Sequence, residues 1–379
     1  MKSAFSLLRE NRKNREPCVH GGEVWEAASR CGLREEEILD FSSSVNPLGA
    51  SEKALEAVKA CLTRISSYPD SNSTALRQAI ANRFEGVSVD NVIAGNGSTE
   101  LIYLFAETFM HKGDVALIPA PTFGEYERAA SKTGAEPKFV KPNSDFQFNP
   151  AAFTRNSSGV KVVFFCNPNN PTSALMPMEH LAVIVERAFE ENVLVFLDED
   201  FLEFVDHEEQ LSFVGKISCY PNLFVLRSFT KIFGLTGLRI GYGVASEEII
   251  KLLLNAKIPW NVNCLAQAAA IAALEDKEHL NRTRELVRGE KAFLVSELRR
   301  IDVFKIFPAD ANFIFIDVRE SGFTAAELKE KMLRYGILIR DCSSFRGLDE
   351  HFVRVAVKTR RENERLLEAF RITVGRHGE

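Results

Sequence analysis

The chain has 379 residues, of which 45% are hydrophobic and 26% charged, and this is the composition of an ordinary globular protein. Its length suggests about two domains. Its formal net charge of −5 excludes the overall positive field that attracts nucleic acid or anionic lipid. We therefore expect a small-molecule substrate, with no nucleic-acid partner and no membrane partner.

Cysteine and histidine spacing speaks against a disulfide framework and a metal site. The seven cysteines are scattered, odd in number and without a C-x-x-C pair, and the seven histidines show no i, i+4 pair. The opening sequence MKSAFSLLRENRKNREP lacks the apolar core of a signal peptide, and no apolar run approaches the roughly 18 residues that span a bilayer. The expectation is a cytoplasmic protein without a metal.

The first predicted elements are short apolar runs rich in β-branched and aromatic residues. Such runs, apolar on both faces, are typical of strands in a parallel sheet covered by helices. They occupy residues 92–94, 115–118, 162–165, 193–197, 223–226 and 240–244. Helical patterns at 100–110 and 178–190 lie between them, so residues 50–275 are predicted to form a large α/β domain.

The C-terminal part follows a different pattern. Apolar positions recur at helical spacing over residues 276–301, which predicts a long helix leading out of the large domain. Strands are predicted at 313–318, 337–340 and 352–357, and a closing helix at 362–372. Residues 276–379 are thus predicted to form a smaller α+β domain, with residues 1–49 as an N-terminal segment that packs with it.

The stretch Ser228-Phe-Thr-Lys-Ile-Phe-Gly-Leu-Thr-Gly-Leu-Arg-Ile-Gly-Tyr242 places one lysine in a hydroxyl-rich loop between two strands. Burial would favour the neutral form of Lys231, a nucleophile able to form a Schiff base. Arg239, with Ser228 and Thr230, would bind a phosphate through charge-assisted hydrogen bonds. The alternative is an ordinary loop lysine and a surface arginine.

A second anion site is predicted at Gly95-Asn-Gly-Ser-Thr-Glu100, which follows a strand and opens a helix. Free backbone N–H groups and the positive end of the helix would lie at Gly97, Ser98 and Thr99. The segment lacks the third glycine of a dinucleotide fingerprint and the Gly-Lys-Ser/Thr of a P-loop. A plain helix cap explains the same residues.

Two polar residues follow other predicted strands. Asp198 ends the strand at 193–197, where a carboxylate would keep a pyridine nitrogen protonated; a helix cap or a metal ligand are the alternatives. Asn170 lies in the turn Cys166-Asn-Pro-Asn-Asn-Pro-Thr172 and would hydrogen-bond a phenolic oxygen, although turn formation alone also accounts for this sequence.

In this order, these segments resemble the fold-type-I pyridoxal-phosphate family that contains the class I/II aminotransferases, over essentially the whole chain. The resemblance implies that Lys231 bonds to the cofactor, Asp198 contacts its pyridine nitrogen, Asn170 contacts its ring oxygen and Phe123 stacks on the ring. The implied phosphate ligands are Gly97, Ser98, Thr99, Ser228, Thr230 and Arg239.

The resemblance also implies a homodimer with shared active sites, because Tyr68 of Ser67-Tyr-Pro-Asp70 would reach the site of a second subunit. Arg354 matches the arginine that binds the substrate carboxylate, although an exposed strand arginine is the alternative. Phe201 stands where most aminotransferases have a tyrosine, and Ser173 replaces a glycine. Because Phe201 lacks the tyrosine hydroxyl, the resemblance to aminotransferases does not by itself predict efficient transamination.

Within the family, His20-Gly-Gly22, the segment 40–49 and the segment 339–348 resemble the threonine-phosphate decarboxylases of cobalamin biosynthesis. This implies decarboxylation of L-threonine O-3-phosphate to (R)-1-aminopropan-2-yl phosphate. Histidinol-phosphate aminotransferase, phosphoserine decarboxylase and a non-catalytic descendant remain alternatives. Residues predicted to bind the phosphorylated substrate are His20, Gly21, Asn46, Arg340, Arg346 and Arg354.

Overall fold

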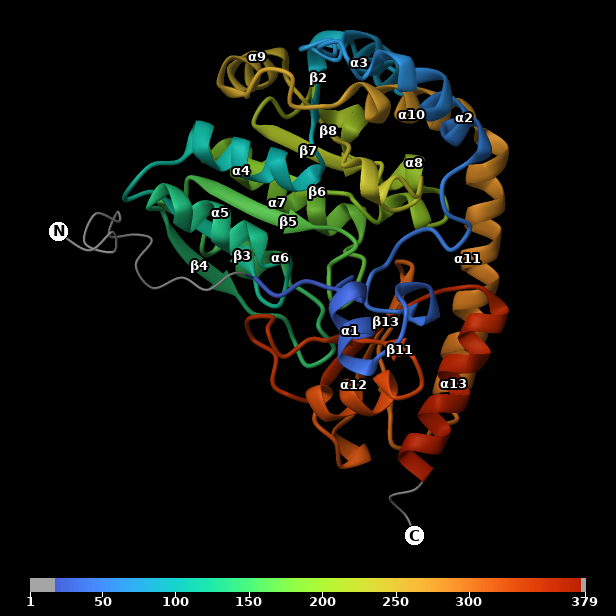
Figure 1. Ribbon diagram of the computed structural model, residues 1–379. Helices are drawn as coiled ribbons and strands as arrows, with labels where there is room; N and C mark the ends of the chain where they lie inside the picture. The colour runs from blue at the N-terminus through green and yellow to red at the C-terminus, as the bar shows by residue number, and fades with distance from the viewer. Residues whose placement is uncertain (1–17, 376–379) are drawn as a thin grey trace, which may run out of the picture.

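The structure is a computed structural model that describes residues 18–375, so residues 1–17 of the predicted N-terminal segment lie outside it (Figure 1). Its centre is a seven-stranded sheet in the order β2-β8-β7-β6-β5-β3-β4. The strands are β2 (Val92–Gly95), β3 (Val115–Pro119), β4 (Glu136–Val140), β5 (Val162–Cys166), β6 (Leu194–Asp198), β7 (Leu223–Ser228) and β8 (Gly241–Ala245).

The sheet is mostly parallel, as predicted. Strands β4, β3, β5, β6 and β7 pair in parallel, whereas β8 is antiparallel to both β7 and β2. All six predicted strands are present. Strand β4 was missed because its sequence, Glu-Pro-Lys-Phe-Val, alternates in exposure and contains a proline, and both features belong to an edge strand.

Helices cover both faces of this sheet, which explains why its central strands are mostly apolar on both faces. Phe164 of β5 packs with the buried faces of α4 (Ser98–Phe109) and α5 (Glu125–Thr133), while its neighbours Val163 and Phe165 face the opposite side with residues of α7 (Met178–Glu190). The helices of this part are α2 (Glu52–Cys61), α3 (Thr74–Ala81), α4 (Ser98–Phe109), α5 (Glu125–Thr133), α6 (Pro150–Thr154), α7 (Met178–Glu190), α8 (Glu208–Leu211), α9 (Glu247–Ala256) and α10 (Cys264–Glu275).

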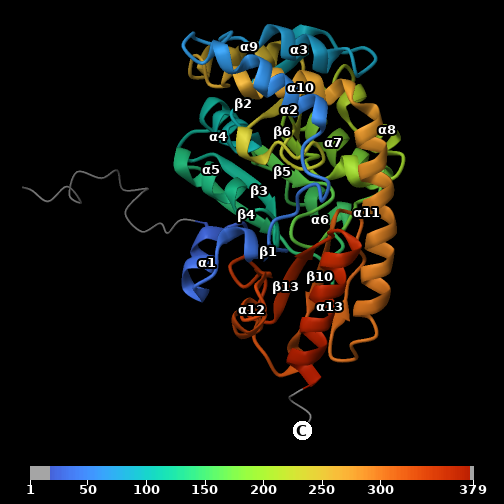
Figure 2. The same cartoon turned by 45° about the vertical axis from the view of Figure 1, so that its right-hand side comes forward.

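The long helix α11 (Lys277–Leu298) runs along one side of the molecule and leads into a second, smaller sheet (Figure 2). That sheet has the order β12-β13-β10-β9. Its strands and helices are β9 (Lys305–Ile306), β10 (Phe313–Asp317), α12 (Ala325–Leu333), β12 (Arg340–Asp341), β13 (Phe352–Ala356) and α13 (Arg360–Gly375). One apolar core continues from the large sheet through α11 to α13.

The N-terminal segment lies against this smaller part. After α1 (Val24–Cys31), strand β1 (Leu39–Asp40) pairs in parallel with β11 (Ile337–Leu338). The single strand predicted at 337–340 is therefore wrong: it is divided between β11 and β12, which belong to different sheets. The apolar run concealed the division because Ile339, between the two pairings, is itself buried.

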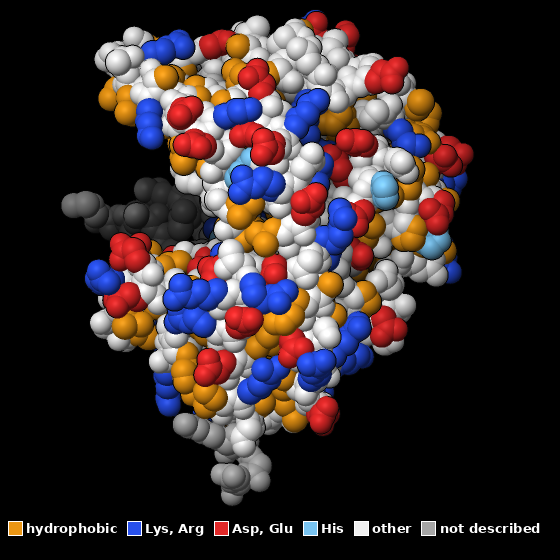
Figure 3. All heavy atoms as spheres, turned by 90° about the vertical axis from the view of Figure 1, so that its right-hand side faces the viewer, with side chains coloured by type: hydrophobic (Ala, Val, Ile, Leu, Met, Phe, Trp, Pro, Cys, Tyr) orange, Lys and Arg blue, Asp and Glu red, His pale blue; other side chains and the backbone are white. Residues whose placement is uncertain are grey.

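The surface has no extended area of one charge on the face shown in Figure 3, where acidic and basic side chains alternate. Within residues 18–375, no helix combines the length and apolarity needed to cross a membrane.

Candidate active site

A cavity of about 1050 Å³ opens where the strands of the large sheet end, and three separate parts of the chain line it. Thr122 and Phe123 follow β3, Asn170 follows β5, Phe201 follows β6 and Lys231 follows β7. The carboxyl ends of parallel strands are where α/β proteins bind ligands. Thr99, Arg239 and residues of the segment 124–131 complete the side that belongs to the large sheet. The remaining walls come from residues 18–21 with 42–44, and from residues 340–348 with Arg354.

Lys231 extends into this cavity from the loop after β7. Its Nζ lies 3.8 Å from Oδ2 of Asp200 and 5.4 Å from the centre of the Phe201 ring. The side chain is 25% exposed, so it is less buried than the sequence suggested. Its backbone carbonyl accepts a hydrogen bond of 3.0 Å from the Asn46 N–H, which anchors the loop.

Asp198, at the end of β6, is the most deeply buried acid of the site at 4% exposure. The Tyr126 hydroxyl donates to its Oδ2 at 2.6 Å, and the Asp200 N–H donates to its Oδ1 at 2.9 Å. Burial, together with the charge of Asp200, raises the pKa of Asp198 to about 7. A cation such as a pyridinium N–H would stabilise this carboxylate, so its surroundings fit the cofactor that the sequence predicts.

The predicted phosphate site forms at the N-terminus of α4. Gly97 has φ +81°, and a Cβ added there would collide with the Arg239 guanidinium. A guanidinium beside free N–H groups of a helix end suits a phosphate. Thr99 lines the cavity close by. Arg239 also donates from Nη1 to the Thr236 carbonyl at 3.1 Å, which orients it.

Ser228 and Thr230, also predicted to bind the phosphate, are buried and do not line the cavity. Their hydroxyl oxygens lie 2.6 Å apart, and the Thr230 N–H donates to the Ser228 Oγ at 2.9 Å. In this geometry the two residues brace the turn that carries Lys231. Ser98 is the first residue of α4, and its N–H faces Gly241, where a side chain would not fit.

Arg354 lies at the base of the cavity on β13 and is buried. Its Nη1 donates to the Asn170 Oδ1, and its Nη2 donates to the Ser42 carbonyl at 2.7 Å. Its Nε is buried without a partner among the described residues. Burial lowers the pKa of Arg354 to about 10, and the charge of Arg340 acts in the same direction.

Arg340 is the cross-strand partner of Arg354 and is equally buried, at 6% exposure. It donates from Nη2 to the Val19 carbonyl at 2.7 Å and to the Ser344 Oγ at 3.0 Å, and from Nη1 to the His20 carbonyl at 3.3 Å. Two cations directly opposite each other in a sheet repel. An anion in the cavity would offset this repulsion.

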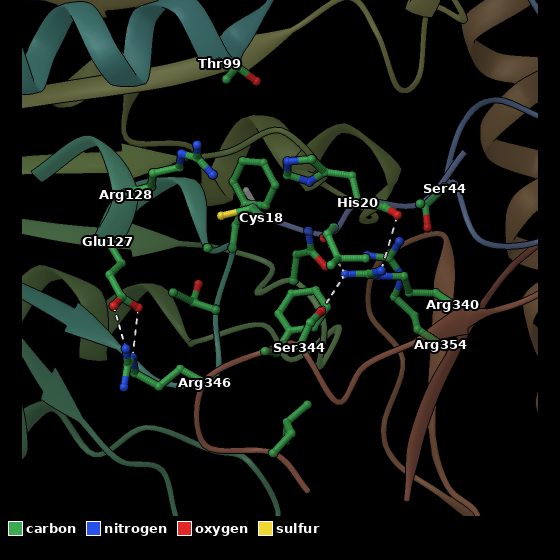
Figure 4. Close-up of a pocket in the computed structure, with 18 of the residues that line it drawn as sticks. Cys18, His20, Ser44, Thr99, Glu127, Arg128, Arg340, Ser344, Arg346 and Arg354 are labelled. Carbon is green, nitrogen blue, oxygen red and sulfur yellow. Dashed lines mark hydrogen bonds and ion pairs between the residues drawn. The ribbon is translucent and has the colours of Figure 1, made fainter. Parts of the chain in front are cut away.

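Figure 4 shows His20, Arg340 and Arg354 on one side of the cavity, and Arg128, Glu127 and Arg346 on the other. Arg346 forms a two-pronged ion pair with Glu127, from Nε to Oε2 at 2.8 Å and from Nη2 to Oε1 at 2.5 Å. The positive charge of Arg346 is therefore already paired.

Like Ser228 and Thr230, the predicted residues Asn46, Tyr68, Gly97, Ser98 and Asp198 do not line the cavity. The Asn46 amide is buried and donates to the Ile232 carbonyl at 2.7 Å and the Thr283 hydroxyl at 3.0 Å. It supports the lysine loop, and this geometry does not bring it to the substrate position that the sequence suggested. Tyr68 is 79% exposed and stacks on Trp260, with ring centres 4.6 Å apart.

Sequence reasoning missed three residues that shape this site: Glu125, Tyr126 and Asp200. The sequence could have indicated Tyr126, because Tyr126 lies three residues after Phe123 and residues three apart lie on the same face of a helical turn. Glu125 and Asp200 carried no such signal, because their partners His20 and Lys231 are distant in sequence.

Comparison with known proteins identifies the family. The sequence profile of the family "Aminotransferase class I and II" matches residues 36–370. A histidinol-phosphate aminotransferase of Methanosarcina mazei is 37% identical over 98% of each chain. A protein named as a putative threonine-phosphate decarboxylase, of Caldanaerobacter subterraneus subsp. tengcongensis, is 38% identical over 96% of each chain.

Two solved structures are similar over most of the chain. The L-threonine-O-3-phosphate decarboxylase of Porphyromonas gingivalis has a TM-score of 0.79 and 30% identity, and covers 88% of this chain and 99% of its own. The histidinol-phosphate aminotransferase of Sinorhizobium meliloti in complex with pyridoxal-5'-phosphate has a TM-score of 0.87 and covers 99% of each chain; at 20% identity it shows the shared fold. This chain belongs to the aminotransferase class I and II family, has its fold-type-I architecture and uses pyridoxal phosphate as its cofactor.

Proposed function

We propose that this protein decarboxylates L-threonine O-3-phosphate to (R)-1-aminopropan-2-yl phosphate, a precursor in cobalamin biosynthesis. The observation that carries the proposal is the pair Arg340 and Arg354, two buried cations on adjacent strands of one cavity wall. Their mutual repulsion favours a ligand with more than one negative group. Phosphothreonine has both a carboxylate and a phosphate.

The cofactor would be held by the residues that converge on the cavity from the large sheet. Lys231 would carry it, Asp198 would face its ring nitrogen, Phe123 would stack on its ring, and Gly97 with Arg239 would hold its phosphate. When bound, pyridoxal phosphate provides an electron sink for the bond that breaks at the α-carbon of the substrate.

The protein's own residues would decide which bond at the α-carbon breaks, because they fix the orientation of the substrate. Arg354, fixed by Asn170 and by the Ser42 carbonyl, would hold the carboxylate. His20 and Arg340 would bind the phosphate at the other end of the substrate. Two anchored ends fix the orientation of the α-carbon, and Lys231 Nζ would then return a proton to that carbon.

The test is to incubate purified holoenzyme with O-phosphothreonine and with O-phosphoserine, and to measure carbon dioxide and the amine product. We expect carbon dioxide from phosphothreonine. Phosphoserine lacks one methyl group, which a pocket discriminates by only about 1 to 3 kcal/mol, so slower release from it is compatible with the proposal. No carbon dioxide from either compound would overturn it.

Histidinol-phosphate transamination is the second candidate, because a relative of that name is 37% identical over nearly the whole chain. The same cations would bind the phosphate of histidinol phosphate and the carboxylates of an oxoacid. Incubation with histidinol phosphate and 2-oxoglutarate separates the two: formation of glutamate without carbon dioxide would establish the transaminase.

We also propose that the protein acts as a homodimer in which Tyr68 serves the partner's site. Tyr68 stacks on Trp260, and three more exposed apolar residues lie within six positions of one or the other along the chain, namely Leu62, Ile65 and Ile258. Exposed apolar clusters of this kind are typical of association surfaces. Light scattering should give twice the mass of one chain, and the double substitution Ile65→Asp with Ile258→Asp should shift the protein to the monomer.

A further inference from the structure

Glu125, the first residue of α5, is a buried acid next to the active-site cavity but does not line it. One oxygen, Oε1, lies 2.9 Å from Nε2 of His20, and the other accepts a hydrogen bond from the Tyr103 hydroxyl at 2.5 Å. Burial alone would raise the pKa of Glu125, but the hydrogen bonds from His20, Tyr103 and Cys18 outweigh it and lower this pKa to about 2. Glu125 is therefore an anion that accepts hydrogen bonds from three side chains.

His20, which hydrogen-bonds to Glu125, belongs to a short segment, residues 18–22, that we call the strap. The opposite edge of the strap is fixed by the smaller part of the molecule, since Arg340 donates to the carbonyls of Val19 and His20. The Gly22 N–H donates to the Ser42 Oγ at 2.8 Å. Through Glu125 on one side and Arg340 on the other, the strap joins α5 of the large sheet to the arginine pair of the small one. Figure 4 shows His20 beside Arg340.

These contacts fix how the His20 ring faces the cavity that it lines. Because Glu125 is an anion, Nε2 of His20 must donate to it, which leaves Nδ1 for a ligand. No hydrogen bond to Nδ1 occurs within residues 18–375. The ring centre lies 5.8 Å from that of Phe123, the residue predicted to stack on the cofactor. To bridge Glu125 and a phosphate oxygen, the ring must donate from both nitrogens.

We propose that Glu125 is a positioning residue for the substrate phosphate: it orients His20 so that the free ring nitrogen binds the phosphate. The proposal rests on the proposed function in that it requires a phosphorylated ligand at this end of the cavity. It does not depend on which reaction follows.

The test measures the binding of isopropyl phosphate to the holoenzyme by titration calorimetry, since this compound has no amino group with which to react. Loss of one charge-assisted hydrogen bond should weaken binding by about 10-fold in His20→Ala. Glu125→Gln should weaken it by a similar factor. The double variant should be no weaker than either single variant, because both changes remove the same interaction.

A purely structural role of Glu125 would give a different result. In that case, substitution of Glu125 would weaken the binding of L-threonine as much as the binding of isopropyl phosphate. L-threonine binding is measured by the change in cofactor absorbance, and we expect it to stay constant. Glu125→Asp, which withdraws the carboxylate by one methylene, provides a milder variant that should show the same selective loss. Glu107→Gln, on exposed α4 surface, is the matched control and should bind both ligands normally.

Additive effects in the double variant, or unchanged isopropyl phosphate binding in both Glu125 variants, would overturn the role of Glu125. If the wild-type protein does not bind isopropyl phosphate, this inference fails together with the phosphate part of the proposed function. If it binds isopropyl phosphate but releases no carbon dioxide from phosphothreonine, only the proposed reaction fails.

Discussion

The two ends of the active-site cavity are built in different ways. At the cofactor end, Asp198 is the last residue of β6, Asn170 follows β5 and Lys231 follows β7, and these three strands are direct neighbours in one sheet. At the substrate end, His20, Arg340 and Arg354 come from the strap and from two strands of the small sheet. The first end is fixed by local strand-and-turn sequence, whereas the second depends on contacts across more than 300 residues, such as Arg340 to Val19.

This difference has an electrostatic consequence. The cofactor end holds a buried carboxylate, Asp198, that favours a cation, and the substrate end holds two buried arginines that favour anions. Each end therefore has buried charged side chains whose charge the ligand of that end would neutralise. Substitutions at the two ends should have different effects on cofactor binding and substrate binding.

The largest effect is expected at the cofactor end from Lys231→Ala. Loss of the only covalent anchor should abolish the absorbance of the lysine-bound cofactor and reduce turnover by on the order of 10⁴-fold or more. Absorption spectra and steady-state kinetics measure both. Turnover that persists without Lys231 would contradict the assignment of this end of the cavity.

Because Asp198 is buried at the cofactor end, the unfolding free energy of the apoenzyme should depend on pH. The pKa of Asp198 is raised from 3.8 to about 7, so its stabilising contribution is complete below about pH 4 and is lost as the pH rises through 7. Between pH 5 and 8, the wild-type apoenzyme should lose up to about 3 kcal/mol more unfolding free energy than Asp198→Asn, because the pH passes through the last two units below the pKa of about 7. Urea unfolding at both pH values tests this, with the exposed Asp145→Asn as control; equal losses in both proteins would disprove it.

At the substrate end, Arg354→Lys should leave cofactor binding intact and lower kcat/KM for phosphothreonine by about 100-fold, because lysine cannot replace the two-pronged contact of a buried guanidinium. Cofactor absorbance and steady-state kinetics give the two readouts. A loss of cofactor, rather than of kcat/KM, would show that the two ends are not independent.

The smallest effect is expected from Glu127→Gln, which releases Arg346 from its ion pair. If Arg346 attracts the substrate phosphate, KM for phosphothreonine should fall by about 2- to 5-fold at low salt, with kcat unchanged, as is usual for partly exposed charges. An unchanged KM would place Arg346 outside the binding path. Raising the salt concentration should diminish the difference between the variant and the wild type.

The sequence by itself determined the class of fold, the order of the strands in the chain and the placement of Asp198, Asn170 and Lys231 at or after the ends of neighbouring strands. It could do so because apolar runs specify buried strands, and because a parallel sheet brings the residues after its strands to one edge. Lys231, Asp198 and Asn170 were placed by that reasoning without any knowledge of long-range contacts.

Only the tertiary structure decided the substrate end. It showed that Arg346 is paired with Glu127, that Asn46 supports the lysine loop, and that Glu125 holds His20. It also divided the predicted strand 337–340 between two sheets. The physical reason is that the state of a charged or amide side chain depends on the partner it meets in space, and a pattern of neighbouring residues does not specify that partner.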